Sequence, residues 1–215
     1  DTLPSSSYVS HFLVHDQYVD DSVEDCFSIT DWIAQSDTNA QDGWLFISSH
    51  TREHTTLKPL ISAWLDVAAN ALLSLPRNRE RRIWFIINEL PTLQELPSLL
   101  NLMALGREYG ACVWFDVQSI PQLKKTFGHD VASELIDLCG TGLYFRANED
   151  ETASKVSKLL CEQEVQAVVE NISYGAAEIR DGISLSVNEK VKPLVLPSEI
   201  QRLPDLSAFL RLPGD

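Results

Sequence analysis

The sequence is poor in basic residues. Lys and Arg together number 17 against 31 Asp and Glu, which gives a formal net charge of −14 at pH 7. A protein that binds nucleic acid over a broad surface is usually basic, because it must neutralise phosphates. The charge therefore excludes a broad nucleic-acid-binding surface and confines any such contact to a loop or a pore face.

Closely spaced cysteines are also lacking. The four cysteines are Cys26, Cys112, Cys139 and Cys161, and no two of them form a CxxC motif. This spacing excludes the usual cysteine-based zinc and redox motifs. Each cysteine has an apolar neighbour, which favours buried free thiols in a reducing compartment.

No apolar run approaches the roughly 18–20 residues that span a bilayer. No signal peptide precedes Asp1, and the sequence does not start with Met. We therefore expect the chain to be a fragment of a longer protein, with any membrane anchor outside it.

Four of the five histidines lie in HxxxH pairs, at residues 11 and 15 and at residues 50 and 54. The second pair reads HTREH and formally matches the HxxEH pattern of some zinc proteases. A zinc site would need one helix that carries both histidines. We expect that helix to begin only at Thr55 or Thr56, so the sequence favours solvated loop histidines.

Short apolar runs alternate with helical patterns along most of the chain. This alternation predicts an α/β fold built on an open, largely parallel sheet, whose strands are buried on both faces. The predicted strands are residues 43–48, 83–87, 111–117, 143–145 and 208–212. The predicted helices are residues 55–75, 97–109, 120–127, 130–138, 151–161 and 198–203. Outside these we expect a short strand or turn at 27–33, with Asp31 as an alternative helix start, and a polar excursion at 162–192.

Polar residues follow two of the predicted strands. Asn88 and Glu89 come directly after the strand 83–87, and Gln118 follows the strand 111–117. Ligands of parallel α/β sheets bind beyond the carboxyl ends of the strands. An apolar strand that ends in an acid is the pattern of a Walker B motif, in which the acid polarises the attacking water. The alternative is that Glu89 only caps a helix or lies in a solvated turn.

Longer stretches of the chain resemble conjugative coupling proteins of the TraD type. The segment 84–97 (WFIINELPTLQELP) is similar to their Walker B region, 106–110 (GREYG) to the segment after it, and 117–119 (VQS) to their Gln-Ser motif. Further similar stretches are 43–49 (GWLFISS), 57–60 (LKPL), 173–175 (SYG), 179–182 (IRDG), 203–206 (LPDL) and 212–214 (LPG). They stay in the same order from about residue 27 to the end.

The resemblance implies a RecA-like, largely parallel sheet with flanking helices, as half of a P-loop NTPase motor domain. Residues 27–215 would be the C-terminal part of that nucleotide-binding domain, and residues 1–26 the tail of a helical insert domain or a linker. The full-length protein would bind ATP and Mg²⁺ and form a hexamer. It would act on the cytoplasmic face of the inner membrane, where it would recruit relaxosome proteins and pump DNA into a type IV secretion channel.

The resemblance also implies roles for four residues. Glu89 would be the catalytic base, and Asn88 would occupy the position that holds the Mg²⁺ shell. Gln118 would sense the terminal phosphate. Arg107 would reach the nucleotide of a neighbouring subunit as an arginine finger.

Two features depart from the family pattern. The sequence has no GxxxxGK[ST] loop to cradle phosphates, and Asn88 stands where the Walker B motif has Asp. A neutral amide keeps an oxygen acceptor but loses the charge that favours Mg²⁺. We therefore expect no tight binding of ATP or Mg²⁺ by this chain alone, and no measurable hydrolysis. The alternative function is a catalytically inactive motor-like module that only docks partners or substrates.

For several other charged and aromatic residues we predict structural roles rather than roles in binding. We expect the arginines of 79–82 to lie in a solvated turn, and Lys124 and Lys125 to lie on a helix surface rather than on DNA. We expect Arg146 to form an ion pair rather than to contact nucleotide. The tryptophans at 32, 44, 64, 84 and 114 are expected in the core, because their neighbours are mostly apolar.

Overall fold

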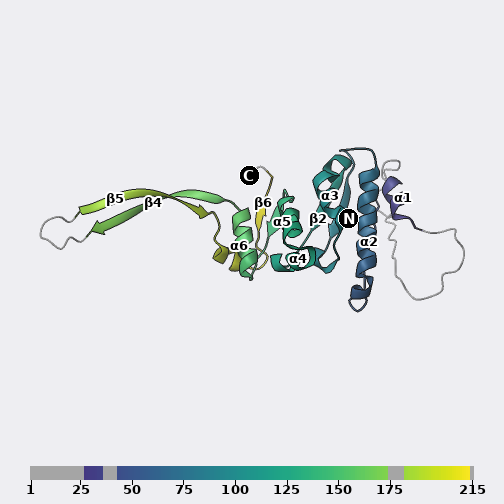
Figure 1. Cartoon of the computed structure of the whole chain (residues 1–215), viewed down its shortest axis with the longest axis horizontal. Helices are drawn as coiled ribbons and strands as arrows, with labels where there is room; N and C mark the ends of the chain where they lie inside the picture. Colours follow the sequence, from purple (N-terminus) through teal and green to yellow (C-terminus); the bar gives the residue numbers. More distant parts are fainter. Residues whose placement is uncertain (1–26, 36–42, 174–181, 214–215) are drawn as a thin grey trace, which may run out of the picture. The chain divides into compact units, whose positions relative to one another are not determined.

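The chain divides into two compact units, with the boundary between Leu138 and Cys139. The computed structural model describes residues 27–35, 43–173 and 182–213 (Figure 1). Helices and a parallel strand pair occur together in the first unit, as expected for the α/β class.

A parallel pair of strands lies at the centre of the first unit. β1 (Ile83–Ile87) pairs with β2 (Ala111–Phe115), in register from Ile83 opposite Ala111 to Ile87 opposite Phe115. Alternate side chains of β1 point to opposite faces. Phe85 and Ile87 are buried in the core, whereas Trp84 and Ile86, on the other face, are exposed.

Helices cover the face of this sheet that carries Phe85 and Ile87. α2 (His54–Ser74) buries Ile61, Ala68, Ala69 and Leu72, which recur at helical spacing, and it ends just before Pro76. α3 (Pro97–Leu105) packs beside α2 (Figure 1). The predicted helix 97–109 is therefore α-helical only to Leu105, and η4 (Gly106–Tyr109) continues it as a 3₁₀ turn.

Gly110 ends η4 and leads directly into β2. Its φ of 83° is in the left-handed region, and an added Cβ would lie only 2.4 Å from the backbone oxygen of Arg81. Arg81 itself is buried, and its guanidinium donates to the carbonyls of Tyr109 at 3.0 Å and Pro76 at 3.3 Å. The solvated turn expected at 79–82 is therefore wrong for Arg81, which ties the start of β1 to the start of β2.

The segment before the first predicted strand is helical. α1 (Ile29–Ala34) is capped by Ser28, whose hydroxyl accepts a hydrogen bond from the amide of Asp31 at 3.2 Å. Ile33 is buried against α2. The strand or turn predicted for 27–33 is wrong, and the alternative helix does form but begins at Ile29 rather than at Asp31, because Ser28 supplies the cap.

At the carboxyl end of the strands, short elements close the core. η3 (Leu90–Thr92) follows β1, and α4 (Ile120–Phe127) and α5 (His129–Asp137) follow β2. Ser119 caps α4 by accepting from the amide of Gln122 at 3.4 Å. Leu90, Leu123 and Leu135 are fully buried together, so the turn after β1 is anchored by hydrophobic packing.

The second unit has its own small core. β3 (Gly142–Tyr144) pairs antiparallel with β6 (Phe209–Arg211), and α6 (Asp150–Leu159) packs against α7 (Pro197–Gln201) around Ile200. β4 (Glu162–Ser173) and β5 (Gly182–Pro193) pair antiparallel over twelve residues each. The polar excursion predicted for 162–192 is therefore largely strand, because ladder hydrogen bonds can form without an apolar pattern.

The single, largely parallel sheet predicted from the apolar runs is only partly correct. The strands 83–87 and 111–117 do pair in parallel, although β2 ends at Phe115. The strand expected at 143–145 instead pairs antiparallel with β6, and the segment 43–48 has a single bridge residue, Trp44. An apolar run predicts burial, but it does not say which partner strand supplies the hydrogen bonds.

Three of the tryptophans expected in the core are exposed. Trp44, Trp84 and Trp114 expose 56%, 59% and 52% of their surface, and Trp44 stacks on Phe46 with ring centroids 6.0 Å apart. Trp84 and Trp114 lie on the face of the β1–β2 pair opposite to Phe85 and Ile87. Within the described part of the chain, that face of the sheet is exposed.

Candidate functional site

The chain turns sharply where β1 ends. The amide of Asp116 donates to the carbonyl of Ile87 at 3.3 Å, and the amide of Leu90 donates to the carbonyl of Asp116 at 3.1 Å. These two bonds fold Asn88 and Glu89 over the carboxyl end of β2. Asn88 is exposed and Glu89 is half-buried.

Glu89 has an unusual backbone conformation. Its φ of 56° and ψ of 58° place it in the left-handed region, which costs a residue with a side chain roughly 1–2 kcal/mol. Thr92 holds the carbonyl of Glu89 twice, through its amide and its hydroxyl, each at 2.8 Å. Such strain persists where the surroundings fix it, and it occurs often at functional sites.

Gln118 lies beside Glu89. Its side-chain amide donates a hydrogen bond to the carboxylate Oε1 of Glu89. The prediction that these two residues share the carboxyl edge of the sheet is therefore confirmed. Asn88, the residue before Glu89, lies at the same edge, so three of the four predicted site residues come together.

Arg107 lies at the other end of the strands. It is exposed in η4, which leads into the amino end of β2, whereas Glu89 follows the carboxyl end of β1. Four residue steps of a strand span about 13 Å. Within one chain, the structure therefore does not bring Arg107 to Glu89.

His54 is a residue that the sequence analysis misjudged. It is half-buried at the start of α2, with its Nδ1 at 2.8 Å from Ser49 Oγ and its Nε2 at 3.3 Å from the carbonyl oxygen of Thr92. The expected solvated loop histidine is wrong for this position. The described part of the chain also holds no group of three His, Cys, Asp or Glu side chains that could bind a metal. His54 is instead held by two polar contacts at a half-buried position.

Asp116 is a second residue of this edge that was not predicted from the sequence. The predicted strand 111–117 includes it, but β2 ends at Phe115, so Asp116 is an acid at the carboxyl edge of the sheet. The acid at position 116, directly after the apolar run, was the sequence signal that could have identified this residue. Its backbone carries the turn that presents Glu89, as described above.

The donor set at this edge fits a magnesium nucleotide. Mg²⁺ keeps several waters and is usually held by one or two protein oxygens together with substrate phosphates. The amide oxygen of Asn88 supplies such an oxygen, the carboxylate of Glu89 can accept a proton from water, and the amide of Gln118 supplies a donor suited to a phosphate oxygen. The neutral Asn88 is the weak element of this set.

The cysteines are not all buried as expected. Cys161 is exposed, whereas Cys112 and Cys139 are half-buried, and Cys26 lies outside the described residues. Burial raises the pKa of the Cys139 thiol above its ordinary value, opposed by nearby Arg211. Cys139 is thereby kept protonated and poorly reactive, as a structural thiol is.

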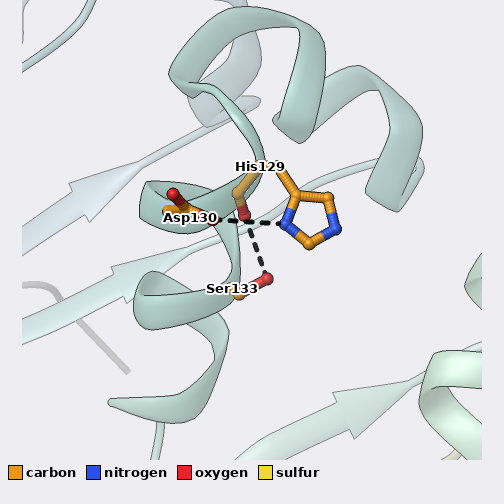
Figure 2. Close-up of polar contacts among 3 residues, drawn as sticks. All are labelled: His129, Asp130 and Ser133. Carbon is orange, nitrogen blue, oxygen red and sulfur yellow. Dashed lines mark hydrogen bonds and ion pairs between the residues drawn. The ribbon is translucent and has the colours of Figure 1, made fainter.

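A hollow of about 510 Å³ lies on α5, away from the predicted site. Figure 2 shows three of its residues: Nδ1 of His129 lies 3.5 Å from the carboxylate of Asp130, and the hydroxyl of Ser133 donates to the carbonyl of His129 at 3.0 Å. These are contacts on the exposed side of one helix, with Asp130 fully solvated. The hollow therefore brings together no pair of groups suited to catalysis.

Other structural expectations can be compared with the described residues. Arg146 forms the expected ion pair, with Asp205 at 2.6 Å, and also donates to the carbonyl of Leu203. No helix in the described ranges is both long and apolar enough to cross a membrane.

The comparisons with known proteins agree on one protein family. The family model described as the type IV secretion-system coupling protein DNA-binding domain matches residues 9–215. The coupling protein TraD of Escherichia coli K12 is 40% identical over 188 residues, which cover 87% of this chain and 26% of TraD. The coupling protein VirD4 of Bartonella quintana is 27% identical over 131 residues, 61% of this chain and 20% of VirD4.

Solved structures of the coupling protein TrwB have the same fold. Unbound TrwBdeltaN70 superposes with a TM-score of 0.72 at 31% identity, over 88% of this chain and 42% of that one. TrwB in complex with ADP and Mg²⁺ gives 0.69 at 32% identity, over 88% and 41%. This likeness confirms the expected RecA-like α/β motor fold. The chain spans less than half the length of each of these relatives.

Proposed function

The chain belongs to the type IV secretion-system coupling protein family, and from this premise we propose that it carries the hydrolytic edge of a DNA-transfer motor. In the full-length protein, ATP hydrolysis would drive the DNA–relaxase complex into a type IV secretion channel. The motor would be a hexamer on the cytoplasmic face of the inner membrane, anchored by a segment outside this chain. Residues 27–215 would form the C-terminal part of its nucleotide-binding domain, and residues 1–26 the tail of a helical insert domain or a linker.

The observation that carries this proposal is the pairing of Glu89 with Gln118. Two residues 29 positions apart meet at the carboxyl end of two parallel strands, where α/β proteins bind their ligands. Glu89 is also held in a strained conformation by Thr92. A solvated turn would need neither feature.

Each residue at this edge has a role on the proposal. Glu89 orients the attacking water and accepts its proton, because its carboxylate is fixed and half-buried. Gln118 donates from its amide to the developing charge, and leaves Glu89 when that partner is present. Asn88 offers its amide oxygen to the metal hydration shell. Bound magnesium ATP would supply the phosphoryl group to be transferred. Its Mg²⁺ would supply the positive charge that neutralises this group.

Arg107 takes part from a neighbouring subunit on this proposal. Its place at the amino end of the strands removes it from the Glu89 edge of its own chain, and its exposed side chain is free to reach outward. A guanidinium supplied by another subunit can stabilise transition-state charge in this class of motor.

The second candidate is a docking module without activity. Asn88 and the net charge of −14 favour it, since both weaken the case for a metal–phosphate site in this chain. The module would bind transfer substrates or partner proteins through the same fold.

Plasmid transfer between cells separates the two candidates. Full-length protein with Glu89→Gln should lower transfer at least about a hundredfold, because loss of a general base commonly costs that much. Glu95→Gln is the matched control, as Glu95 is exposed in the same segment, and it should transfer as the parent does. Transfer at the parent level with Glu89→Gln would favour the docking module.

A further inference from the structure

The turn that presents Glu89 is held from two neighbouring helices. The first helix is α2: Nε2 of His54 lies 3.3 Å from the carbonyl oxygen of Thr92, the last residue of η3. The second is α4: the hydroxyl of Thr126 donates to the carbonyl of Pro91 at 3.0 Å. Adjacent carbonyls of η3 are therefore fixed by side chains from α2 and α4.

Thr92 connects His54 to Glu89. The amide and the hydroxyl of Thr92 both donate to the carbonyl of Glu89 at 2.8 Å, which closes η3 around the left-handed residue. If Thr92 moved, Glu89 would lose both of these bonds. The position of Thr92 therefore bears directly on the conformation of Glu89.

The chemistry of the contacts fixes the role of the ring. A carbonyl oxygen only accepts, so Nε2 of His54 must carry the proton. In the neutral ring Nδ1 is then an acceptor, and it takes a hydrogen bond from the hydroxyl of Ser49 at 2.8 Å. Ser49 thus orients the ring, and the ring orients Thr92, in the way that outer partners fix a histidine elsewhere.

We propose that His54 is a positioning residue for Glu89: through Thr92, it holds the turn that keeps the Glu89 carboxylate at the strand edge. This rests on the proposed function for its effect on hydrolysis, but not for its effect on the turn. His54 does not touch the reacting groups, so it acts only through the backbone of η3.

Two substitutions separate the hydrogen bond from packing. In His54→Gln the side-chain amide can still donate to Thr92, whereas in His54→Leu a side chain of similar size cannot. Both residues are good helix formers, so α2 is retained. Ser49→Ala removes only the partner of Nδ1, and His50→Leu is the matched control, since the side chain of His50 is exposed.

The first measurement is hydrogen exchange of the full-length protein by mass spectrometry, followed in the peptide 88–96. His54→Leu should speed exchange in this peptide about tenfold, the equivalent of one lost hydrogen bond. Ser49→Ala should shift it in the same direction by less, and His54→Gln and His50→Leu should match the parent. Unchanged exchange in His54→Leu would overturn the proposal, and so would equal effects of Leu and Gln. If His54→Leu does not fold, Ser49→Ala alone decides, and unchanged exchange there would overturn it.

The second measurement is steady-state ATP hydrolysis by the same proteins. His54→Leu should lower kcat about tenfold with KM unchanged, because only the group acting on water is displaced. A parent-like kcat in His54→Leu with faster exchange would overturn the link to Glu89. If the parent protein itself hydrolyses no ATP, the proposed function fails, and the exchange measurement still decides whether His54 holds the turn.

Discussion

At the scale of single residues, Glu89 depends on its backbone as much as on its carboxylate. A left-handed φ of 56° turns the chain immediately after β1, so the side chain meets Gln118 instead of continuing along the strand. The sequence predicted both residues, because strand-end polar groups are visible in the pattern. It did not predict His54 or Thr92, because a hydrogen bond between residues 38 positions apart leaves no local signal.

Asn88 is the residue where a single charge should matter most. In the full-length protein, Asn88→Asp should raise ATP hydrolysis, since one oriented charge at a phosphoryl-transfer site is worth about 3 kcal/mol, roughly a hundredfold in rate. Adjacent carboxylates repel one another, so the gain should require saturating Mg²⁺. Steady-state kinetics with and without excess Mg²⁺ measures this.

Asn101→Asp is the matched control for charge, because Asn101 is exposed on α3. It should leave hydrolysis unchanged. If Asn88→Asp is no faster than the parent at saturating Mg²⁺, Asn88 is not the limiting defect of the site.

At the scale of elements, the junction between η4 and β2 depends on one glycine. Gly110→Ala should destabilise the chain by about 3 kcal/mol, because it combines a left-handed conformation with an approach of 2.4 Å to the Arg81 backbone. Gly140→Ala is the comparison, because φ there is not in the left-handed region and the nearest atom to an added Cβ lies 3.9 Å away. It should change the free energy of unfolding by less than about 0.5 kcal/mol. Denaturant unfolding of both variants measures the two losses, and a loss in Gly110→Ala as small as that in Gly140→Ala would contradict this prediction.

Elements were predicted unevenly for physical reasons. The strand 83–87 and the helix 120–127 match β1 and α4, because apolar periodicity and the Ser119 cap act locally. The pairing of β3 with β6 and the long β4–β5 ladder were missed, because partner choice depends on contacts distant in sequence. α1 was predicted only as an alternative that starts at Asp31, because its cap, Ser28, was assigned to a strand or turn.

At the scale of the whole molecule, one face of the β1–β2 pair is exposed in the described part of the chain. Trp84, Ile86 and Trp114 each expose more than half of their surface there. Parallel sheets are normally covered on both faces, and this chain spans 42% of TrwBdeltaN70. The expected core position is therefore wrong for Trp84 and Trp114 in the described part of the chain.

The central claim is that Glu89 and Gln118 form one hydrolytic centre, and a double-mutant cycle on the full-length protein tests it. Magnesium-dependent ATP hydrolysis should fall at least about a hundredfold in Glu89→Gln and more modestly in Gln118→Ala. Because the two side chains act on the same water and phosphate, the double variant should be no slower than Glu89→Gln alone. Hydrolysis at the parent rate in Glu89→Gln, or full additivity of the two losses, would contradict the account.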